Sequence, residues 1–465
     1  MTAITVADGD RAFLGHPKAL GYLAFTEAWE RFSFYGMQSL LVLYMVNQLL
    51  LPGHIENVAG FPAFRGFIEG MYGRELSTQA LASAIFGLYA GFVYLTPILG
   101  GILADRLLGK TATILTGAVL MAAGHFLMAF DVSFLLALAC LILGCGCFKG
   151  NIASQVGGLY GEGDLRRADA FQIFYLGINF GVIAAPLVAG TLGEKVGWHY
   201  GFGVAGVGML VALVIYLTGR RHLPPDPPMS SIPKADRPKL GPGEGRTVLL
   251  LILLLPVLAV AALPNQQIFN AYLIWAEQNV DMVFFGQRMP TTWLITLDTL
   301  TSVSFLAAMV IFWRLWAKRF KEPDEIGKIT IGCFVAVAGV LCLAAGAAIQ
   351  QATGEKVSIL WPIAFHLLNS IAFANIMPVS LALFARAAPR ALAATIIGVF
   401  YLHFFAANNI VGWLGGFLER MPATQFWLIH AAAAGGAGLV FLVVGRFLAR
   451  MLSHENTSVA RGQAV

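Results

Sequence analysis

The chain has 465 residues, of which 58% are hydrophobic and only 12% are charged, and its mean hydropathy is +0.74. Ordinary soluble domains carry about a quarter charged residues, so this chain cannot cover several globular domains with a solvated surface. The composition also excludes disordered, collagen-like and coiled-coil proteins, and it predicts an integral membrane protein of the all-α class. The net charge of +5 does not indicate a nucleic-acid partner, because the basic residues lie in short loops between apolar segments.

Apolar segments long enough to cross a hydrocarbon core of about 30 Å occur in two sets of six. The expected spans lie at roughly 20–50, 79–104, 111–130, 132–153, 168–193, 200–219, 247–278, 291–316, 328–350, 358–385, 391–417 and 424–449. The seventh segment is interrupted by Pro256 and Pro264 and is too short for two spans. We therefore expect one long, kinked or tilted helix there.

A polar stretch rich in proline, glycine and charge separates the two sets of spans. Its composition predicts an extended linker. The expected domains are a six-helix bundle at 1–219, a cytoplasmic linker at 220–246 and a second six-helix bundle at 247–465. Two such halves form the architecture in which a site near the bilayer midplane is exposed to one side and then to the other.

The distribution of basic residues predicts the orientation of the chain. Of the 30 Lys and Arg residues, 22 lie in segments that share the side of the N-terminus, six lie on the opposite side and two lie inside apolar segments. Cytoplasmic loops of membrane proteins are enriched in Lys and Arg. Both termini are therefore expected in the cytoplasm.

Three ionisable residues lie within the first apolar segment. At 100° per residue, Glu27, Glu30 and Arg31 fall in one arc of about 140° on a helix, together with Phe34, Tyr35 and Gln38. An ionisable group at the bilayer centre costs about 2.5 to 3.5 kcal/mol, so this stripe is expected to face the bundle interior. Lys149 in the fourth segment is the other cation inside an apolar segment, and it is the predicted partner of the stripe.

Two interpretations of this charge cluster are open. A carboxylate paired with a cation keeps its charge, whereas one whose cation is drawn away is easier to protonate. A substrate carboxylate that competes for Arg31 and Lys149 would then couple transport to proton uptake. The alternative is an ion network that only stabilises helix packing.

The second half holds fewer charges inside apolar segments. Asp298 lies within the eighth segment, and Glu277 closes the seventh, where an acid at the membrane surface is equally expected. Lone amides and histidines of the apolar segments are interpreted as packing or interface residues. They are Asn369, Asn375, Asn408, Asn409, His125, His366, His403 and His430.

No motif of an enzyme is present in the sequence. It lacks hydrolase, metalloprotease and phosphate-loop patterns, so we expect no catalytic residues, and a primary pump would need a nucleotide site that the chain lacks. The five cysteines lie in apolar stretches without a histidine or carboxylate at ligand spacing, so no metal site is expected. Small residues at 144–147 are interpreted as a close helix contact. Energy is expected from an ion gradient, with protons favoured over sodium because the acids lie against cations.

The run from Glu27 to Gly36, Glu-Ala-Trp-Glu-Arg-Phe-Ser-Phe-Tyr-Gly, resembles the E-x-x-E-R-F-x-Y-Y-G signature of the proton-dependent oligopeptide transporters, a family of the major facilitator superfamily. Similar stretches run through most of the first half and recur in the second. They are Tyr94-Leu-Thr-Pro-Ile-Leu-Gly-Gly, Ala104-Asp-Arg, Phe148-Lys-Gly-Asn, Phe174-Tyr-Leu-Gly-Ile-Asn-Phe-Gly, Trp198-His-Tyr-Gly-Phe and Trp275-Ala-Glu-Gln. The resemblance implies twelve transmembrane helices in two six-helix bundles and proton-coupled import of di- and tripeptides by alternating access.

The resemblance also implies roles for individual residues. The proton-coupling group would be Glu27, Glu30, Arg31, Lys149 and Glu277, of which Glu277 matches an acid that gates the outer side by pairing with a cation of the first half. Substrate would be bound by Arg31, Lys149, Tyr35, Tyr94, Asn179, Asp298, Asn375 and Phe400. Arg31 and Lys149 would meet the peptide carboxylate, and the tyrosines with Asn179 would meet its backbone. The implied partners are the peptide, protons and the lipid bilayer, with no cofactor, and the protein is expected to act as a monomer.

Several positions depart from the family pattern. Phe34 replaces a tyrosine, Gln38 replaces a frequent arginine, and Leu273 and Phe400 replace tryptophans. Asn375 aligns with a family glutamate that meets the peptide amino terminus, whereas Asp298 aligns with a family asparagine. We therefore expect Asp298 to hold the substrate ammonium. The same departures leave another small anion or zwitterion, such as an amino-acid derivative or nitrate, as the alternative substrate.

Overall fold

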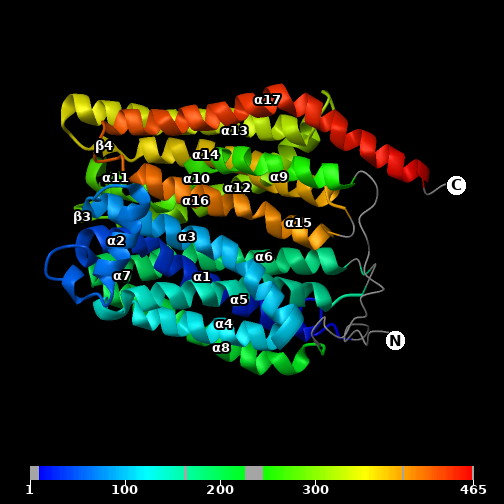
Figure 1. Ribbon diagram of the computed structural model, residues 1–465, viewed down its shortest axis with the longest axis horizontal. Coiled ribbons are helices and arrows are strands. Elements are labelled where there is room, and N and C mark those ends of the chain that lie inside the picture. The colour runs from blue at the N-terminus through cyan, green and yellow to red at the C-terminus, as the bar shows by residue number, and fades with distance from the viewer. Residues whose placement is uncertain (1–9, 162–163, 165, 226–243, 390–391, 463–465) are drawn as a thin grey trace. The chain divides into compact units, whose positions relative to one another are not determined.

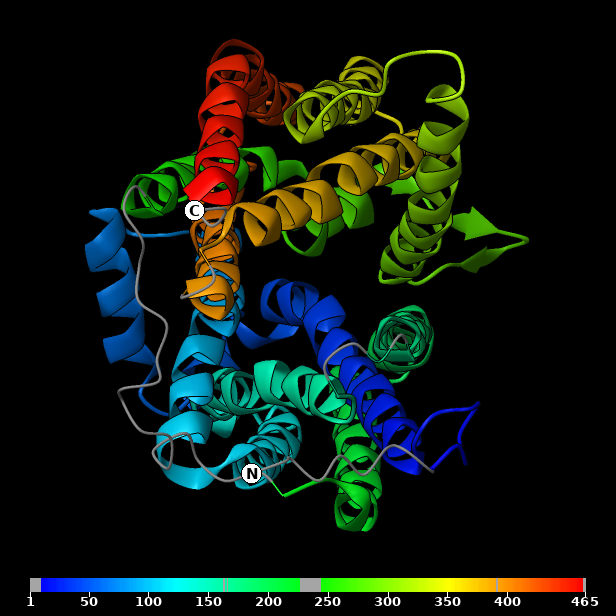
Figure 2. The same ribbon diagram turned by 90° about the vertical axis from the view of Figure 1, so that its right-hand side faces the viewer.

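The computed structural model describes residues 10–161, 164, 166–225, 244–389 and 392–462. The chain forms two compact units, which are considered one at a time. The first comprises Met1–Pro233 and Gln287–Thr299, and the second comprises Lys234–Gly286 and Leu300–Val465. Most of the expected linker at 220–246 lies outside the described residues. Figures 1 and 2 show that the long helices within each unit run side by side.

The first unit is built on six long helices: α1 Lys18–Tyr44, α3 Thr78–Leu103, α4 Lys110–Leu127, α5 Phe134–Gly158, α6 Arg166–Ala185 and α8 Trp198–Gly219. Helix α1 packs against α6 and α8, while α5 packs against α3 and α4. The shorter helical segments are η1 Met45–Leu49, η2 Ile55–Asn57, α2 Phe61–Tyr72, η3 Ala104–Leu108, η4 Asp131–Ser133, η5 Pro186–Gly190, α7 Thr191–Lys195 and η6 Arg220–His222.

The second unit contains α9 Glu244–Ala261, α10 Leu263–Gln266, η9 Gln267–Phe269, α11 Ala271–Asn279, most of α12 Trp293–Trp316, α13 Glu325–Thr353, α14 Leu360–Ala387, α15 Ala393–Phe400, α16 Leu402–Gly415 and α17 Ala423–Gly462. Helix α13 packs against α14 and α17. Strands β1 Val280–Asp281 and β4 Val357–Ser358 pair in parallel. Strands β2 Val283–Phe284 and β3 Gln287–Arg288 lie in the connection between α11 and α12.

Eleven helical segments in the described part of the chain are long and apolar enough to cross a membrane. Helix α1 is not among them, because Glu27, Glu30 and Arg31 interrupt its apolar sequence. Its 27 residues correspond to about 40 Å of helix, which exceeds the hydrocarbon thickness. With α1, the structure has the twelve spans expected from the sequence.

The seventh span differs from the expected kinked helix because it is divided into α9, α10, η9 and α11. Pro264 lies in the first turn of α10, where a missing N–H costs no helical hydrogen bond. The second break is at Asn270, whose φ of −126° and ψ of −112° are not helical. Neighbouring helices supply polar contacts there, since Asn270 Nδ2 donates to Val411 O at 3.3 Å and Gln267 Nε2 lies 2.9 Å from His430 Nε2. Such contacts allow an interrupted helix at membrane depth.

Small residues allow the helices of the first unit to approach closely. A Cβ built on Gly144 or Gly146 of α5 would lie 2.6 Å from Met121 of α4 or Thr96 of α3. A Cβ on Gly177 of α6 would lie 2.9 Å from the Ala24 carbonyl of α1. These contacts agree with the expected close packing at 144–147. They bring α5 close to α3 and α4, and α6 close to α1.

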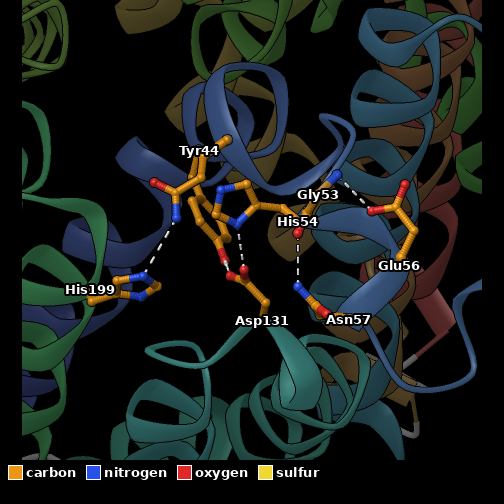
Figure 3. Close-up of polar contacts among 8 residues, drawn as sticks. Tyr44, Gly53, His54, Glu56, Asn57, Asp131 and His199 are labelled. Carbon is orange, nitrogen blue, oxygen red and sulfur yellow. Dashed lines mark hydrogen bonds and ion pairs between the residues drawn. The ribbon is translucent and has the colours of Figure 1, made fainter.

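A polar network fastens the segment after α1 to the start of α5, on the side predicted to face outward. Tyr44 Oη donates to Asp131 Oδ1 at 2.6 Å, and His54 Nδ1 lies 2.7 Å from Asp131 Oδ2. Figure 3 shows both groups converging on this carboxylate, with His199 nearby. Because one carboxylate binds side chains from two segments, it holds the connection to α2 against the bundle.

Candidate functional site

The charged stripe of α1 is buried inside the first unit. Glu27, Glu30 and Arg31 are 3%, 0% and 3% exposed. Arg31 Nε lies 3.1 Å from Glu27 Oε1 and 2.5 Å from Glu30 Oε2, and Arg31 Nη2 donates to Glu30 Oε1 at 2.8 Å. One guanidinium therefore serves two acids from the same helix, because positions 27, 30 and 31 share a face.

The two acids are not equally satisfied. Both oxygens of Glu30 bind Arg31, whereas Glu27 Oε2 is buried without a hydrogen-bond partner among the described residues. An uncompensated buried carboxylate is costly, and a proton on it removes the charge. Glu27 is therefore the acid of this pair that gains more from protonation.

Lys149 on α5 is half-buried beside the stripe. Its Nζ lies 4.6 Å from the Tyr94 ring centroid and 5.9 Å from the Phe34 ring centroid. Over the part of the chain that the structure describes, no carboxylate lies within the 4.0 Å ion-pair distance of this ammonium. The expected ion pair between Lys149 and the α1 acids is thus absent from this conformation, because Arg31 already occupies both acids.

The two cations share an aromatic neighbour. The Phe34 ring lies 5.3 Å from Arg31 Cζ and also faces Lys149. The neighbouring Tyr35 is half-buried, with its ring centroid 5.2 Å from that of Phe34. An aromatic face attracts cations, so these rings hold two like charges near each other without a direct contact.

The structure places Asn179 and Asp298 on elements of the same unit. Asn179 on α6 is half-buried, and its Nδ2 donates to the Tyr175 carbonyl at 2.9 Å. Asp298 is 8% exposed and lies on Trp293–Thr299, the part of α12 that belongs to the first unit. The sequence assigned Asp298 to the second half, so this grouping was not expected.

Residues of the second unit expected to meet substrate are engaged in other contacts. Asn375 is 1% exposed, its Oδ1 accepts from Trp313 Nε1 at 2.9 Å and its Nδ2 donates to Ile371 O at 2.8 Å. Phe400 is fully buried, with its ring centroid 5.0 Å from that of Phe384. In this conformation neither side chain offers a free surface for substrate.

Glu277 is half-buried at the end of α11. Within the second unit, Lys356 Nζ lies 3.4 Å from the Glu277 backbone carbonyl. The expected gating pair would involve a residue of the first half, and its role stays a prediction.

A small, mostly apolar cavity in the second unit was not predicted from the sequence. It has a volume of about 30 Å³, enough for a water molecule, and Asn265, Asn369 and His403 are among its lining residues. Asn369 Nδ2 is buried without a hydrogen-bond partner in the described part of the chain. The sequence signal for this cavity was Asn369, an isolated amide in an apolar helix. Such amides more often stabilise helix packing than mark a cavity.

Comparison with known proteins decides the family. The sequence pattern of the POT family, the proton-dependent oligopeptide transporters, matches residues 111–239 and 245–428. This chain belongs to the POT family. It is an integral, multi-pass membrane transporter with the major facilitator fold, and it is not an enzyme.

Individual POT relatives cover the chain to different extents. The chain is 28% identical to the peptide transporter YePEPT of Yersinia enterocolitica over 96% of this chain and 97% of that protein. It is 33% identical to a di-/tripeptide transporter of Lactococcus lactis subsp. cremoris over 69% of this chain and 57% of the relative. A crystal structure of a mutant peptide transporter POT in complex with alafosfalin matches with a TM-score of 0.82 and 26% identity, covering 95% of this chain and 96% of that one.

Proposed function

We propose that this POT transporter imports di- and tripeptides together with protons by alternating access. The observation that carries the proposal is the arrangement in which Arg31 lies between Glu27 and Glu30, with Lys149 beside them. Protons are the coupling ion, and no cofactor takes part. The protein acts as a monomer in the bacterial inner membrane with both termini in the cytoplasm, as the distribution of basic residues supports.

Lys149 is the first cation that a peptide carboxylate meets. Its ammonium faces the Tyr94 ring rather than an acid, so a bound carboxylate does not have to displace an existing ion pair. A new negative charge at Lys149 also attracts Arg31, whose guanidinium lies near the same Phe34 ring. Substrate binding thereby weakens the hold of Arg31 on its two acids.

Glu27 is the acid that takes up the proton. Its Oε1 makes one contact with Arg31, and its Oε2 makes none in the described part of the chain, whereas Glu30 keeps two contacts. When Arg31 turns toward the substrate, the Glu27 contact is the easier one to lose. The cost of leaving a buried carboxylate without a cation then favours its protonated form.

The ammonium end of the peptide is assigned to Asp298. This carboxylate is almost fully buried and lies on the part of α12 that belongs to the same unit as the cations. Asn375 is a weaker candidate, because its amide side chain carries no negative charge to attract an ammonium group. Tyr35, Tyr94 and Asn179 are proposed to bind the peptide backbone.

A second candidate substrate is another small anion or zwitterion, such as an amino-acid derivative or nitrate. The observation that favours it is the loss of peptide-binding side chains. Leu273 and Phe400 are fully buried, and Phe34 offers no hydroxyl to a peptide. A pocket with fewer polar side chains has fewer contacts for a peptide backbone.

Uptake of a labelled dipeptide into sealed liposomes tests the proposal. An inward proton gradient is expected to drive accumulation by the wild type, whereas Glu30→Gln is expected only to exchange labelled for unlabelled peptide. Correctly inserted wild-type protein that moves no dipeptide, but takes up nitrate or an amino-acid derivative under the same gradient, would establish the second candidate.

A further inference from the structure

A continuous row of contacts joins the end of the fifth span to the start of α12 within the first unit. Two side chains of α12 bind neighbouring helices. Thr296 Oγ1 donates to Ile183 O of α6 at 3.0 Å, and Trp293 Nε1 donates to Thr191 Oγ1 of α7 at 2.8 Å. Further toward the loop, Lys195 Nζ donates to the Arg288 carbonyl at 2.5 Å. The first turns of α12 are thus attached to α6 through Thr296 and to α7 through Trp293.

Glu194 makes the most specific contact of this row. Its Oε2 accepts from Thr291 N at 2.8 Å, and its Oε1 accepts from Thr292 N at 2.9 Å. These amides immediately precede α12, where backbone N–H groups have no partner within the helix. A carboxylate there gains from two charge-assisted hydrogen bonds and from the helix dipole.

The approach is close because Gly190 carries no side chain. A Cβ at that position would overlap the side chain of Thr292. Thr291 and Thr292 are fully buried, so water cannot readily replace the carboxylate at their amides. The start of α12 therefore depends on Glu194 for the satisfaction of both groups.

Asp298 lies on the same short stretch of helix. It follows Trp293 by five residues, which corresponds to about 7.5 Å along a helix axis. Thr296, between them, is held by Ile183. The start of α12 is held at its first residues and at Thr296. The backbone at Asp298, half a turn further on, therefore has little room to move.

We propose that Glu194 is a positioning residue for Asp298, acting through the capped start of α12. The role of Asp298 toward the substrate ammonium rests on the proposed function, whereas the effect of Glu194 on α12 does not. A defect at Glu194 is thus expected to weaken recognition of the ammonium group without removing the groups that bind protons. The cap and the proton-binding cluster are separate sets of side chains.

Glu194→Gln keeps the size of the side chain but changes the hydrogen bonds that it can make. An amide side chain has one acceptor oxygen, and its NH₂ group places a donor against a second backbone donor. One of the two hydrogen bonds is lost and a buried N–H is left unsatisfied. Glu69→Gln is the matched control, because Glu69 also accepts a backbone N–H, that of Leu76 at 2.9 Å, on a different segment of the same unit.

Hydrogen exchange tests the cap without any substrate. In Glu194→Gln, the amides from Thr291 to Asp298 are expected to exchange roughly three- to tenfold faster, the effect of losing an N-cap hydrogen bond. The control is expected to leave them unchanged. Unaltered exchange at Asp298 in Glu194→Gln would overturn the inference.

Transport of two matched dipeptides tests the link to the ammonium. For a dipeptide with a free amino group, Glu194→Gln is expected to raise the half-saturating concentration roughly three- to tenfold, with a nearly unchanged maximal rate. Competition by the N-acetylated dipeptide is expected to change little. In the Asp298→Asn background, where uptake is expected to be lost, binding of the dipeptide is compared instead by its effect on thermal unfolding. Glu194→Gln is expected to have no added effect on that binding, and an additive effect there would also overturn the inference.

The two failures can be told apart. If the wild type moves no dipeptide, the proposed function falls, and the positioning of Asp298 is decided by exchange alone. If the wild type moves dipeptides but Glu194→Gln matches it in exchange and in half-saturation, the proposed function stands and the inference falls.

Discussion

Arg31 binds Glu30 through two nitrogens and Glu27 through one. This inequality predicts different behaviour for the two acids. Glu27→Gln mimics the protonated acid and is expected to exchange peptide at a rate that no longer depends on pH. Glu30→Gln leaves Arg31 free to bind Glu27 fully, so it is expected to lose gradient-driven accumulation while its exchange keeps a pH dependence. Counterflow at several pH values measures both, and a pH-independent rate only in Glu30→Gln would reverse the assignment.

Lys149 is predicted to be required as a cation. Lys149→Gln removes the charge that meets the peptide carboxylate, so pH-driven accumulation is expected to disappear. Lys149→Arg keeps the charge and the contact with the Tyr94 ring, so it is expected to retain part of the activity. Uptake in liposomes at matched protein insertion measures both variants. Normal accumulation by Lys149→Gln would contradict the role.

Asp298 and Asn375 are predicted to respond differently to an exchange of acid and amide. Asp298→Asn is expected to lose transport of peptides with a free amino terminus. Asn375→Asp keeps an acceptor for Trp313 and is expected to be tolerated. Dipeptide uptake compares the two, and the opposite pattern would refute the assignment of the ammonium to Asp298.

Asn375 is also predicted to stabilise the second unit. Asn375→Leu removes the acceptor of a partly buried indole N–H, so a loss of about 1 to 3 kcal/mol is expected. Thermal unfolding in detergent measures it. Asn409→Leu is the control, because Asn409 is only half-buried and its Nδ2 donates to the Phe405 carbonyl of its own helix. Equal losses of stability in the two variants would show that the hydrogen bond to Trp313 does not stabilise the second unit.

Asp131 is predicted to hold the segment between α1 and α2 in place. Asp131→Ala leaves the buried Tyr44 hydroxyl without its acceptor and frees His54, as Figure 3 makes clear. Faster hydrogen exchange over residues 50–60 is expected, with a stability loss of about 1 to 3 kcal/mol. Glu56→Gln is a suitable control, since Glu56 caps only the Gly53 amide and lies outside the Asp131 contacts.

Elementary patterns predicted much of this fold. Apolar segment lengths and the charge distribution indicated twelve spans, and helical periodicity placed Glu27, Glu30 and Arg31 on one buried face. The break at Asn270 was not predictable, because the polar side chains beside it have their partners on α16 and α17, far along the chain. Proline positions alone indicated a kink.

Contacts between distant residues account for the other differences. The ion pair expected at Lys149 is absent because Arg31 occupies both acids, which depends on side-chain conformation rather than spacing. The cap by Glu194 joins residues 97 and 98 positions apart, and no local pattern reports such a pair. The burial of Phe400 follows from its packing against Phe384, which alignment with a family tryptophan does not reveal.

The divided seventh span sets an order for biogenesis. At its break, the Asn270 side chain binds Val411, which is synthesised 141 residues later. The Gln267 side chain binds His430, which is synthesised 163 residues later. While the ribosome is still producing the intervening helices, η9 and α11 have no final partners in the bilayer. The seventh span therefore gains its full set of polar contacts only after the last two spans have been made.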